Sequence, residues 1–128
     1  MFSQAQIDEA RAREAALEQS IRRTVAGEVL RWLSAQDDAA GPAADRDRPD
    51  TVSATVSGVP LTLTTRTGDD RLPADPAAPE PAVRLARRLA SWFRSQDGIQ
   101  DARQITPGPA VTVELDTGDT FSVTIATR

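Results

Sequence analysis

A short acidic segment holds the densest group of side chains that could bind a metal ion. Asp45, Asp47 and Asp50 lie close together in a stretch of small and polar residues. Carboxylate oxygens are the ligands that hard cations such as Ca²⁺ prefer. The spacing, however, lacks the glycine and the closing glutamate of a known calcium loop. We therefore interpret the segment as a solvated acidic loop and predict no metal site.

The residue types that most catalytic sites use are missing from the chain. Its 128 residues include no Cys and no His, and they also lack Lys, Tyr and Asn. The absence of His removes the commonest general base and the commonest zinc ligand. The absence of Cys removes thiol and disulfide chemistry. We expect a protein that is not an enzyme and that carries no cofactor.

One triplet, Asp116-Thr117-Gly118, nevertheless has a catalytic counterpart. It is similar to the active-site triplet of aspartic proteases, in which two such loops share one proton between their carboxylates. That resemblance implies dimerisation, as in the retroviral-type enzymes. The chain departs from the pattern at Asp119, where Ser or Ala is usual, and it lacks the run of strands which that fold requires. Asp-Thr-Gly-Asp is also good turn chemistry, and we favour a turn.

The basic residues offer a second candidate surface. All 15 are Arg, which indicates the codon bias of a GC-rich genome. Four of them fall on the expected solvent side of a helix in the second half, where they could bind phosphates or an acidic partner: Arg84, Arg87, Arg88 and Arg94. A solvated helix face is the simpler interpretation. The net charge of −4 also argues against nucleic acid or an anionic membrane as the main partner.

The chain repeats itself. Residues 25–37 resemble residues 85–97, and the 60-residue shift superposes Trp32 on Trp92 and Gln36 on Gln96. Each segment is followed by a polar, Pro-containing gap and then by two short alternating runs. This pattern predicts a duplicated unit of one helix and two strands. We expect both tryptophans on core stripes and both glutamines on backbone groups at the helix ends.

A long helix is predicted from Ser3, which can form a capping box with Gln6, to about residue 36. Its second half carries an apolar core stripe, namely Leu17, Ile21, Val25, Val29, Trp32 and Leu33. In the first half, Glu14 and Glu18 occupy that same face. Residues 1–16 are therefore expected to project from the body. Candidate partner-binding residues there are Ile7, Ala10 and Glu14.

Two hairpins follow from alternating apolar residues. A two-residue turn at Ser57-Gly58 pairs Val56 with Val59 and places every apolar residue of strands 51–57 and 59–65 on one face. In the second half, pairing 115 with 121 does the same for strands 111–116 and 120–126. That register requires an odd loop, such as residues 117–119 with a glycine bulge. Residues 38–50 and 99–110 are expected to be loops.

These elements assemble into an α+β fold, a tandem αββ-αββ repeat with two helices on one face of a four-stranded antiparallel sheet. Pro60 lacks the donor that a central strand needs, so strand 59–65 is predicted at the sheet edge, with strands 51–57 and 111–116 in the centre. The expected division within one domain is a projecting start (1–16), a first unit (17–66), a linker (67–80) and a second unit (81–128).

The sequence favours a non-catalytic protein-interaction or assembly subunit, which binds a protein partner or a second copy through the N-terminal helix and the sheet edges. The alternative is a regulator that binds nucleic acid or another anionic ligand through the Arg face of the second helix. No signal peptide and no membrane-spanning run is visible, so a cytoplasmic location is expected.

Overall fold

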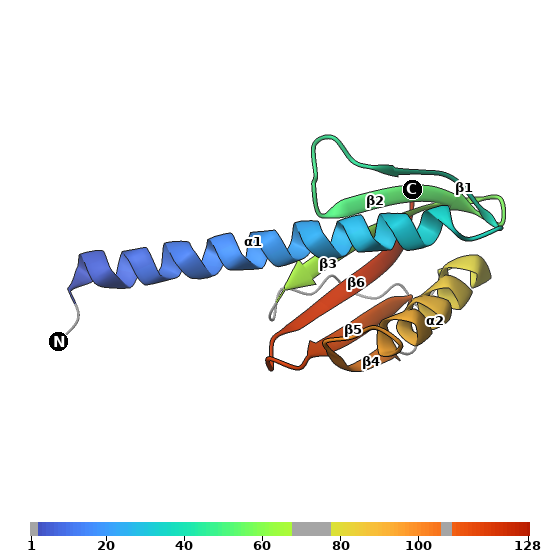
Figure 1. The fold of residues 1–128 in the computed structure, drawn as a ribbon. Coiled ribbons are helices and arrows are strands. Elements are labelled where there is room, and N and C mark those ends of the chain that lie inside the picture. Colours follow the sequence, from blue (N-terminus) through green and yellow to red (C-terminus); the bar gives the residue numbers. More distant parts are fainter. Residues whose placement is uncertain (1–2, 68–77, 106–108) are drawn as a thin grey trace.

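The computed structural model describes residues 3–67, 78–105 and 109–128. Two helices and six strands form an α+β fold in which both helices lie on one face of a single antiparallel sheet (Figure 1). The elements are, in chain order, α1 (Gln4–Ser34), β1 (Ala39–Ala44), β2 (Thr51–Val56), β3 (Val59–Thr67), α2 (Glu80–Arg94), β4 (Ile99–Ile105), β5 (Ala110–Leu115) and β6 (Thr120–Thr127).

The sheet has six strands in the order β1-β2-β3-β6-β5-β4, so the prediction of four strands was wrong. Within the described residues, each half has one helix followed by three strands, which makes the unit one strand longer than predicted. The halves meet through β3 and β6, the third strand of each half. The prediction had joined them through strands 51–57 and 111–116. Helix α1 packs over β1, β2 and β3, and α2 packs over β4, β5 and β6.

The two missed strands are β1 and β4, at the two edges of the sheet, in segments predicted as loops. Each contains a bulge, between Ala40 and Ala43 in β1 and between Ile99 and Asp101 in β4. A bulge breaks the two-residue alternation by which a strand is found in a sequence. The low strand propensity of Ala, Gly and Pro in β1 is overridden by pairing with β2 and by contact with α1.

The first hairpin has the predicted register: Val56 pairs with Val59 across Ser57-Gly58. Both turn residues have positive φ, as this tight turn requires. In the second hairpin Phe121 pairs with Val113, two residues from the predicted partner. The shift of two keeps every apolar side chain on the predicted face.

Pro60 lies in a central strand, which corrects the prediction that β3 is an edge. Its missing N–H does face away from β2, as expected, but the neighbour on that side is β6. The β3–β6 ladder begins at Leu61 and Thr127, so Pro60 stands at its very end, where the Arg128 N–H donates to the Pro60 carbonyl at 3.0 Å. The proline therefore costs one terminal ladder bond and no internal one.

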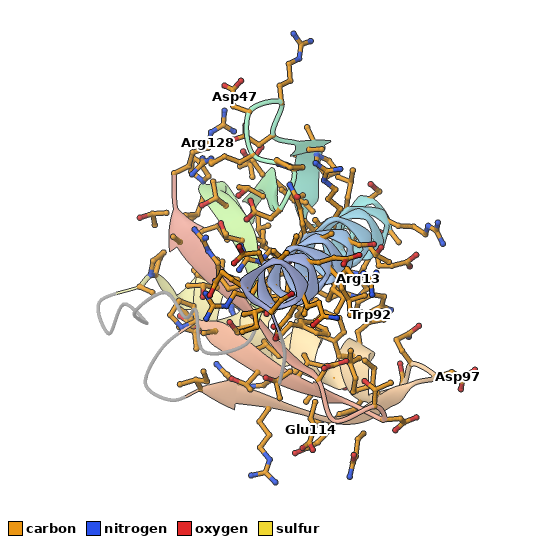
Figure 2. The ribbon with its side chains drawn as sticks, turned by 90° about the vertical axis from the view of Figure 1, so that its left-hand side faces the viewer. Arg13, Asp47, Trp92, Asp97, Glu114 and Arg128 are labelled. Atoms are coloured by element: carbon orange, nitrogen blue, oxygen red, sulfur yellow. The ribbon has the colours of Figure 1, made fainter. Side chains whose placement is uncertain are left out.

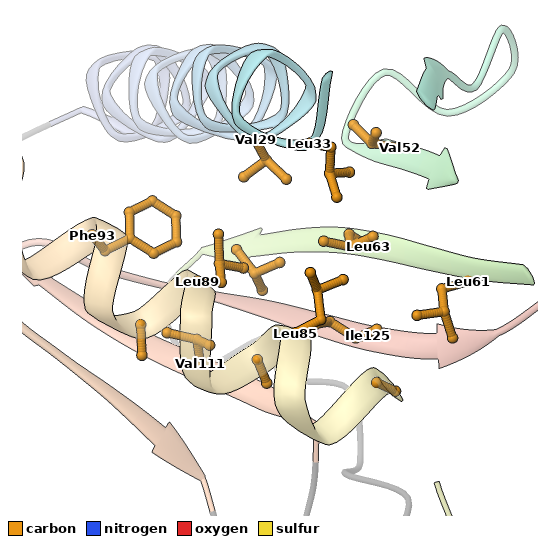
Figure 3. Packing of buried hydrophobic residues seen from close by; sticks show 14 of the residues in the cluster. Val29, Leu33, Val52, Leu61, Leu63, Leu85, Leu89, Phe93, Val111 and Ile125 are labelled. Atoms are coloured by element: carbon orange, nitrogen blue, oxygen red, sulfur yellow. The ribbon is translucent and has the colours of Figure 1, made fainter. Parts of the chain in front are cut away.

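The core lies between the helices and the sheet and draws on both halves (Figure 3). Val29 and Leu33 of α1 and Leu85 and Leu89 of α2 are fully buried over the apolar face of the strands. The ring centroids of Trp32 and Trp92 lie 5.9 Å apart at the seam between the helices. Both tryptophans are half-buried, so they lie at the rim of the core and not inside it.

The opposite face of the sheet is rich in Ser and Thr, as the alternation predicts. Four of its hydroxyl side chains are buried, namely Thr51, Thr64, Ser122 and Thr124. The Oγ1 atoms of Thr51 and Thr64 lie 3.3 Å apart, at hydrogen-bonding distance. The predicted linker 67–80 falls mostly outside the described residues.

Candidate functional site

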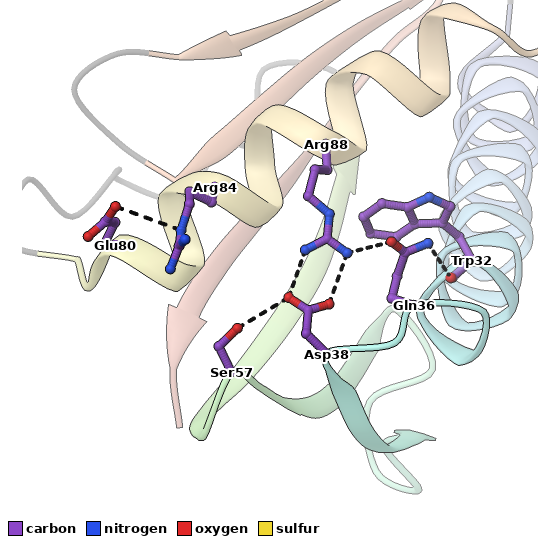
Figure 4. A network of polar contacts seen from close by, with 7 residues as sticks. All are labelled: Trp32, Gln36, Asp38, Ser57, Glu80, Arg84 and Arg88. Carbon is purple, nitrogen blue, oxygen red and sulfur yellow. Dashed lines mark hydrogen bonds and ion pairs between the residues drawn. The ribbon is translucent and has the colours of Figure 1, made fainter.

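The four arginines of α2 do not form one surface, because Arg88 is bound to side chains of the first half of the chain (Figure 4). Its Nη1 donates to Asp38 Oδ2 at 2.8 Å, and its Nη2 donates to Asp38 Oδ1 at 3.0 Å and to the Gln36 side-chain oxygen. The guanidinium also lies 5.9 Å from the centre of the Trp32 ring. Arg88 therefore joins α2 to the segment between α1 and β1, and it is only partly exposed rather than on an open solvent face as predicted.

The environment of Asp38 explains its charge state. Hydrogen bonds from the Arg88 guanidinium hold the pKa of the Asp38 carboxyl below its ordinary value, outweighing the desolvation that would raise it. The Ser57 hydroxyl donates a further hydrogen bond at 3.2 Å. A carboxylate that is fully ionised and bound on both oxygens suits a structural clamp better than proton transfer.

The remaining candidates on α2 are solvent-exposed. Arg84 pairs loosely with Glu80 at 3.8 Å, and Arg87 and Arg94 are exposed. An exposed pair of this kind contributes at most a few tenths of a kcal/mol. The structure thus brings Arg88 to the first half of the chain and leaves the other three on the outside of the helix.

The helix ends confirm the role predicted for the paired glutamines. The Gln36 side-chain amide donates to the Trp32 carbonyl at 3.2 Å, and the Gln96 amide donates to the Trp92 carbonyl at 3.3 Å. Each of these carbonyls, in the last helical turn, also accepts from the backbone N–H three residues on, that of Ala35 or Ser95, at 3.1 Å. The two helices therefore end in the same way.

The acidic loop is held by its own backbone. Asp45 Oδ1 accepts from the N–H groups of Asp47 at 2.9 Å and Arg48 at 3.3 Å, and its other oxygen pairs with the Arg48 side chain at 3.2 Å. These bonds, the Asp47 N–H first, hold the pKa of Asp45 below its ordinary value. Within the described parts of the chain, no three Asp or Glu side chains are grouped as metal ligands would be.

Asp116-Thr117-Gly118 forms the turn between β5 and β6. The Leu115 N–H donates to the Asp119 carbonyl at 2.8 Å, and the Gly118 N–H donates to the Leu115 carbonyl at 2.9 Å. Gly118 has φ +90°, the left-handed conformation of a three-residue loop with a glycine bulge. The loop type is as predicted, one residue earlier in the chain.

The first half of α1 projects beyond the sheet as an exposed helix (Figure 1), and Figure 2 looks nearly along this helix. Every residue from 4 to 17 is exposed, a length of roughly 20 Å at the usual helical rise. The predicted capping box is present at Ser3 and Gln6. An exposed Arg13–Glu9 pair at 2.6 Å adds modest support.

One side of this helix carries a row of residues spaced three and four apart. We call it the projecting stripe, and it consists of Ile7, Ala10, Glu14 and Leu17. Leu17 is 58 % exposed and Ile7 is 37 % exposed. Leu17 was predicted in the core, but the first residue of α1 that packs against the core is Ile21, which follows the stripe by one helical turn. Its apolar character was visible in the sequence; the point at which the sheet ends beneath it was not.

The stripe leads into two hollows beside the body. One, of about 330 Å³, lies between the stripe and the turns of the sheet and is lined by Glu14, Leu17, Ile21 and Asp119 among others. The second, of about 400 Å³, lies between the helices and is lined by Ile21, Val25, Trp92 and Phe93 among others. Neither hollow could be predicted from the sequence, because each is lined by segments far apart in the chain.

The two edges of the sheet, β1 and β4, are poorly suited to pairing with a further strand. Edge strand β1 contains Pro42, which has no N–H to donate, and a bulge. Both features discourage the addition of another strand. In β4, Ala102 is fully buried although it belongs to the edge strand, and α2 packs closely over it.

No family model matches this chain, and no curated protein or solved structure shows significant similarity to it. Among the described helices, neither is long and apolar enough to cross a membrane.

Proposed function

We propose that this chain is a non-catalytic interaction or assembly subunit, which binds a protein partner or a second copy through the N-terminal helix. The projecting stripe carries this proposal. A surface helix that only met water would need no large apolar residues, yet Ile7 and Leu17 are exposed on the same side of a helix that extends about 20 Å from the body.

The energetics also favour a bound state for this segment. A helix of about 14 residues without tertiary contacts is marginally stable in water. Here it continues from a packed half, which removes the cost of nucleation but adds no burial. Packing the stripe against another surface would supply the missing apolar contacts. The sheet edges remain a secondary docking surface in this proposal.

The alternative, an anionic ligand on the Arg face of α2, has weaker support. Arg88 is bound to Asp38, and Arg84 is drawn toward Glu80. Only Arg87 and Arg94 of the four are then left to face a ligand from α2. A specific phosphate site needs several convergent donors, and these two are on an open helix surface.

A matched pair of variants tests the proposal. Ile7→Glu with Leu17→Glu alters the stripe, and Ala5→Glu with Ala16→Glu adds the same charge on the other side of the helix. We expect the first variant to lose self-association in sedimentation equilibrium, or to lose capture of a cellular partner, whereas the second keeps it. Equal behaviour of the two variants in both assays would contradict the proposal. Circular dichroism checks that both remain helical.

A further inference from the structure

We infer that the partner of the projecting stripe is a second copy of the same stripe, with the two α1 helices antiparallel and Ile7 of each chain opposite Leu17 of the other. This inference rests on the proposed function, because it names the partner of that surface. It follows from the sizes and charges of the side chains along the stripe and from the hollow at its base.

The side chains of the stripe are complementary in size when the helix is reversed. Their spacing of three and four residues is that of a helix-pairing seam. In the antiparallel register Ile7 of each chain faces Leu17 of the other chain, so the pair has two such apolar contacts. Between these contacts the small Ala10 faces the long Glu14. Each position thus finds a neighbour that fits its volume.

Charge selects this direction over a parallel one. A parallel pair would place Glu14 against Glu14 in the middle of the seam, and facing like charges are costly. In the antiparallel pair Glu14 lies opposite Ala10, so that Arg11 and Arg13 flank it from the other chain. Both arginines are exposed on the projecting helix, and the symmetry gives two such groups.

The hollow at the base of the stripe fits the end of the partner helix. In the same register the first turn of the partner, at Ser3 to Gln6, reaches Glu18 and Ile21, which line this hollow together with Asp119. A helix N-terminus carries a partial positive charge, so two carboxylates beside it are favourable. In this arrangement the two bodies lie at opposite ends of the helix pair.

Cysteine cross-linking tests the register directly, because the native chain contains no Cys. Ala10→Cys and Glu14→Cys are made as separate single variants of the full chain, mixed in equal amounts and oxidised. We expect the mixed disulfide to exceed the share that random pairing gives. A mixture of Ala5→Cys and Ala12→Cys, on the other side of the helix, should cross-link slowly and without preference. Predominant homodisulfides would indicate a parallel pair and overturn the inference.

A charge exchange provides the second measurement. Glu14→Arg should weaken the dimer by about tenfold in sedimentation equilibrium, since it places Arg against Arg. Adding Arg11→Glu and Arg13→Glu to that variant should restore association. A native chain that stays monomeric over a wide concentration range would overturn the inference. If such a monomer still captured another protein through the stripe, the proposed function would hold without it.

Discussion

The guanidinium of Arg88 contacts three side chains of the first half of the chain: Asp38, Gln36 and Trp32. Hydrogen bonds between charged groups contribute more than neutral ones, about 1.5–3 kcal/mol where they are well buried. Both Arg88 and Asp38 are more than a third exposed, at 38 % and 35 %, so water screens the pair. We assign this pair a contribution of about 1 kcal/mol to the free energy of unfolding, which holds α2 against the end of α1.

The clamp gives a pH-dependent prediction. Because the folded pKa of Asp38 lies below its ordinary value of 3.8, the carboxylate stabilises the fold above that pH and loses its contribution as the pH falls further. Asp38→Asn should lower the free energy of unfolding by about 1 kcal/mol at neutral pH in urea titrations. The difference from the native chain should shrink toward zero below pH 3.8.

Asp97→Asn is the control for that experiment, because Asp97 is exposed and forms no ion pair with the described residues of α2. It should leave the free energy of unfolding nearly unchanged at neutral pH. A loss for Asp38→Asn that persists undiminished in acid would show that the charge on Asp38 is not what stabilises the contact.

At the scale of elements, two glycines play opposite roles. Gly27 lies within helix α1 with nothing near the position of an added Cβ, so it only weakens the helix. Gly118 ends the β5–β6 turn at φ +90°, which a side chain disfavours. Gly27→Ala should stabilise the protein by roughly 0.8 kcal/mol, and Gly118→Ala should destabilise it by about 1 kcal/mol.

Thermal unfolding monitored by circular dichroism measures both glycine variants. Opposite shifts of the midpoint are expected, with Gly27→Ala above the native chain and Gly118→Ala below it. Shifts of the same sign would mean that the helix or the turn differs from the one described.

At the scale of the whole molecule, the two halves share one interior. Leu63 belongs to the first half and Leu89 to the second, and both are fully buried in the same cluster. Leu63→Ala and Leu89→Ala should each lower the free energy of unfolding by about 2–5 kcal/mol. Because the core is common, each variant should shift a single transition in which tryptophan fluorescence and circular dichroism coincide. Two separate transitions would contradict a shared core.

The two halves are matched where their helices end. Trp32 and Trp92 meet at the seam between α1 and α2, and Gln36 and Gln96 close the two helices in the same way. A chain with only one half would leave its tryptophan and its third strand unpaired.

The local features of this protein could be predicted from its amino-acid sequence. The capping box at Ser3, the tight turn at Ser57-Gly58 and the apolar face of each hairpin follow from residue type and spacing, because they depend on neighbours in the chain. The exposed start of α1 could also be predicted, since Glu14 interrupts its apolar face.

The edge strands, the place of Pro60 and the partner of Arg88 depend on contacts that form only in the folded chain. Bulged β1 and β4 form because β2 and β5 offer free edges to pair with, and the position of Pro60 is tolerated because β6 ends beside it. Arg88, predicted on the solvent face of its helix, binds the carboxylate of Asp38, 50 positions away in the chain. These outcomes depend on pairings between distant segments, whose free energies the local pattern of residues does not contain.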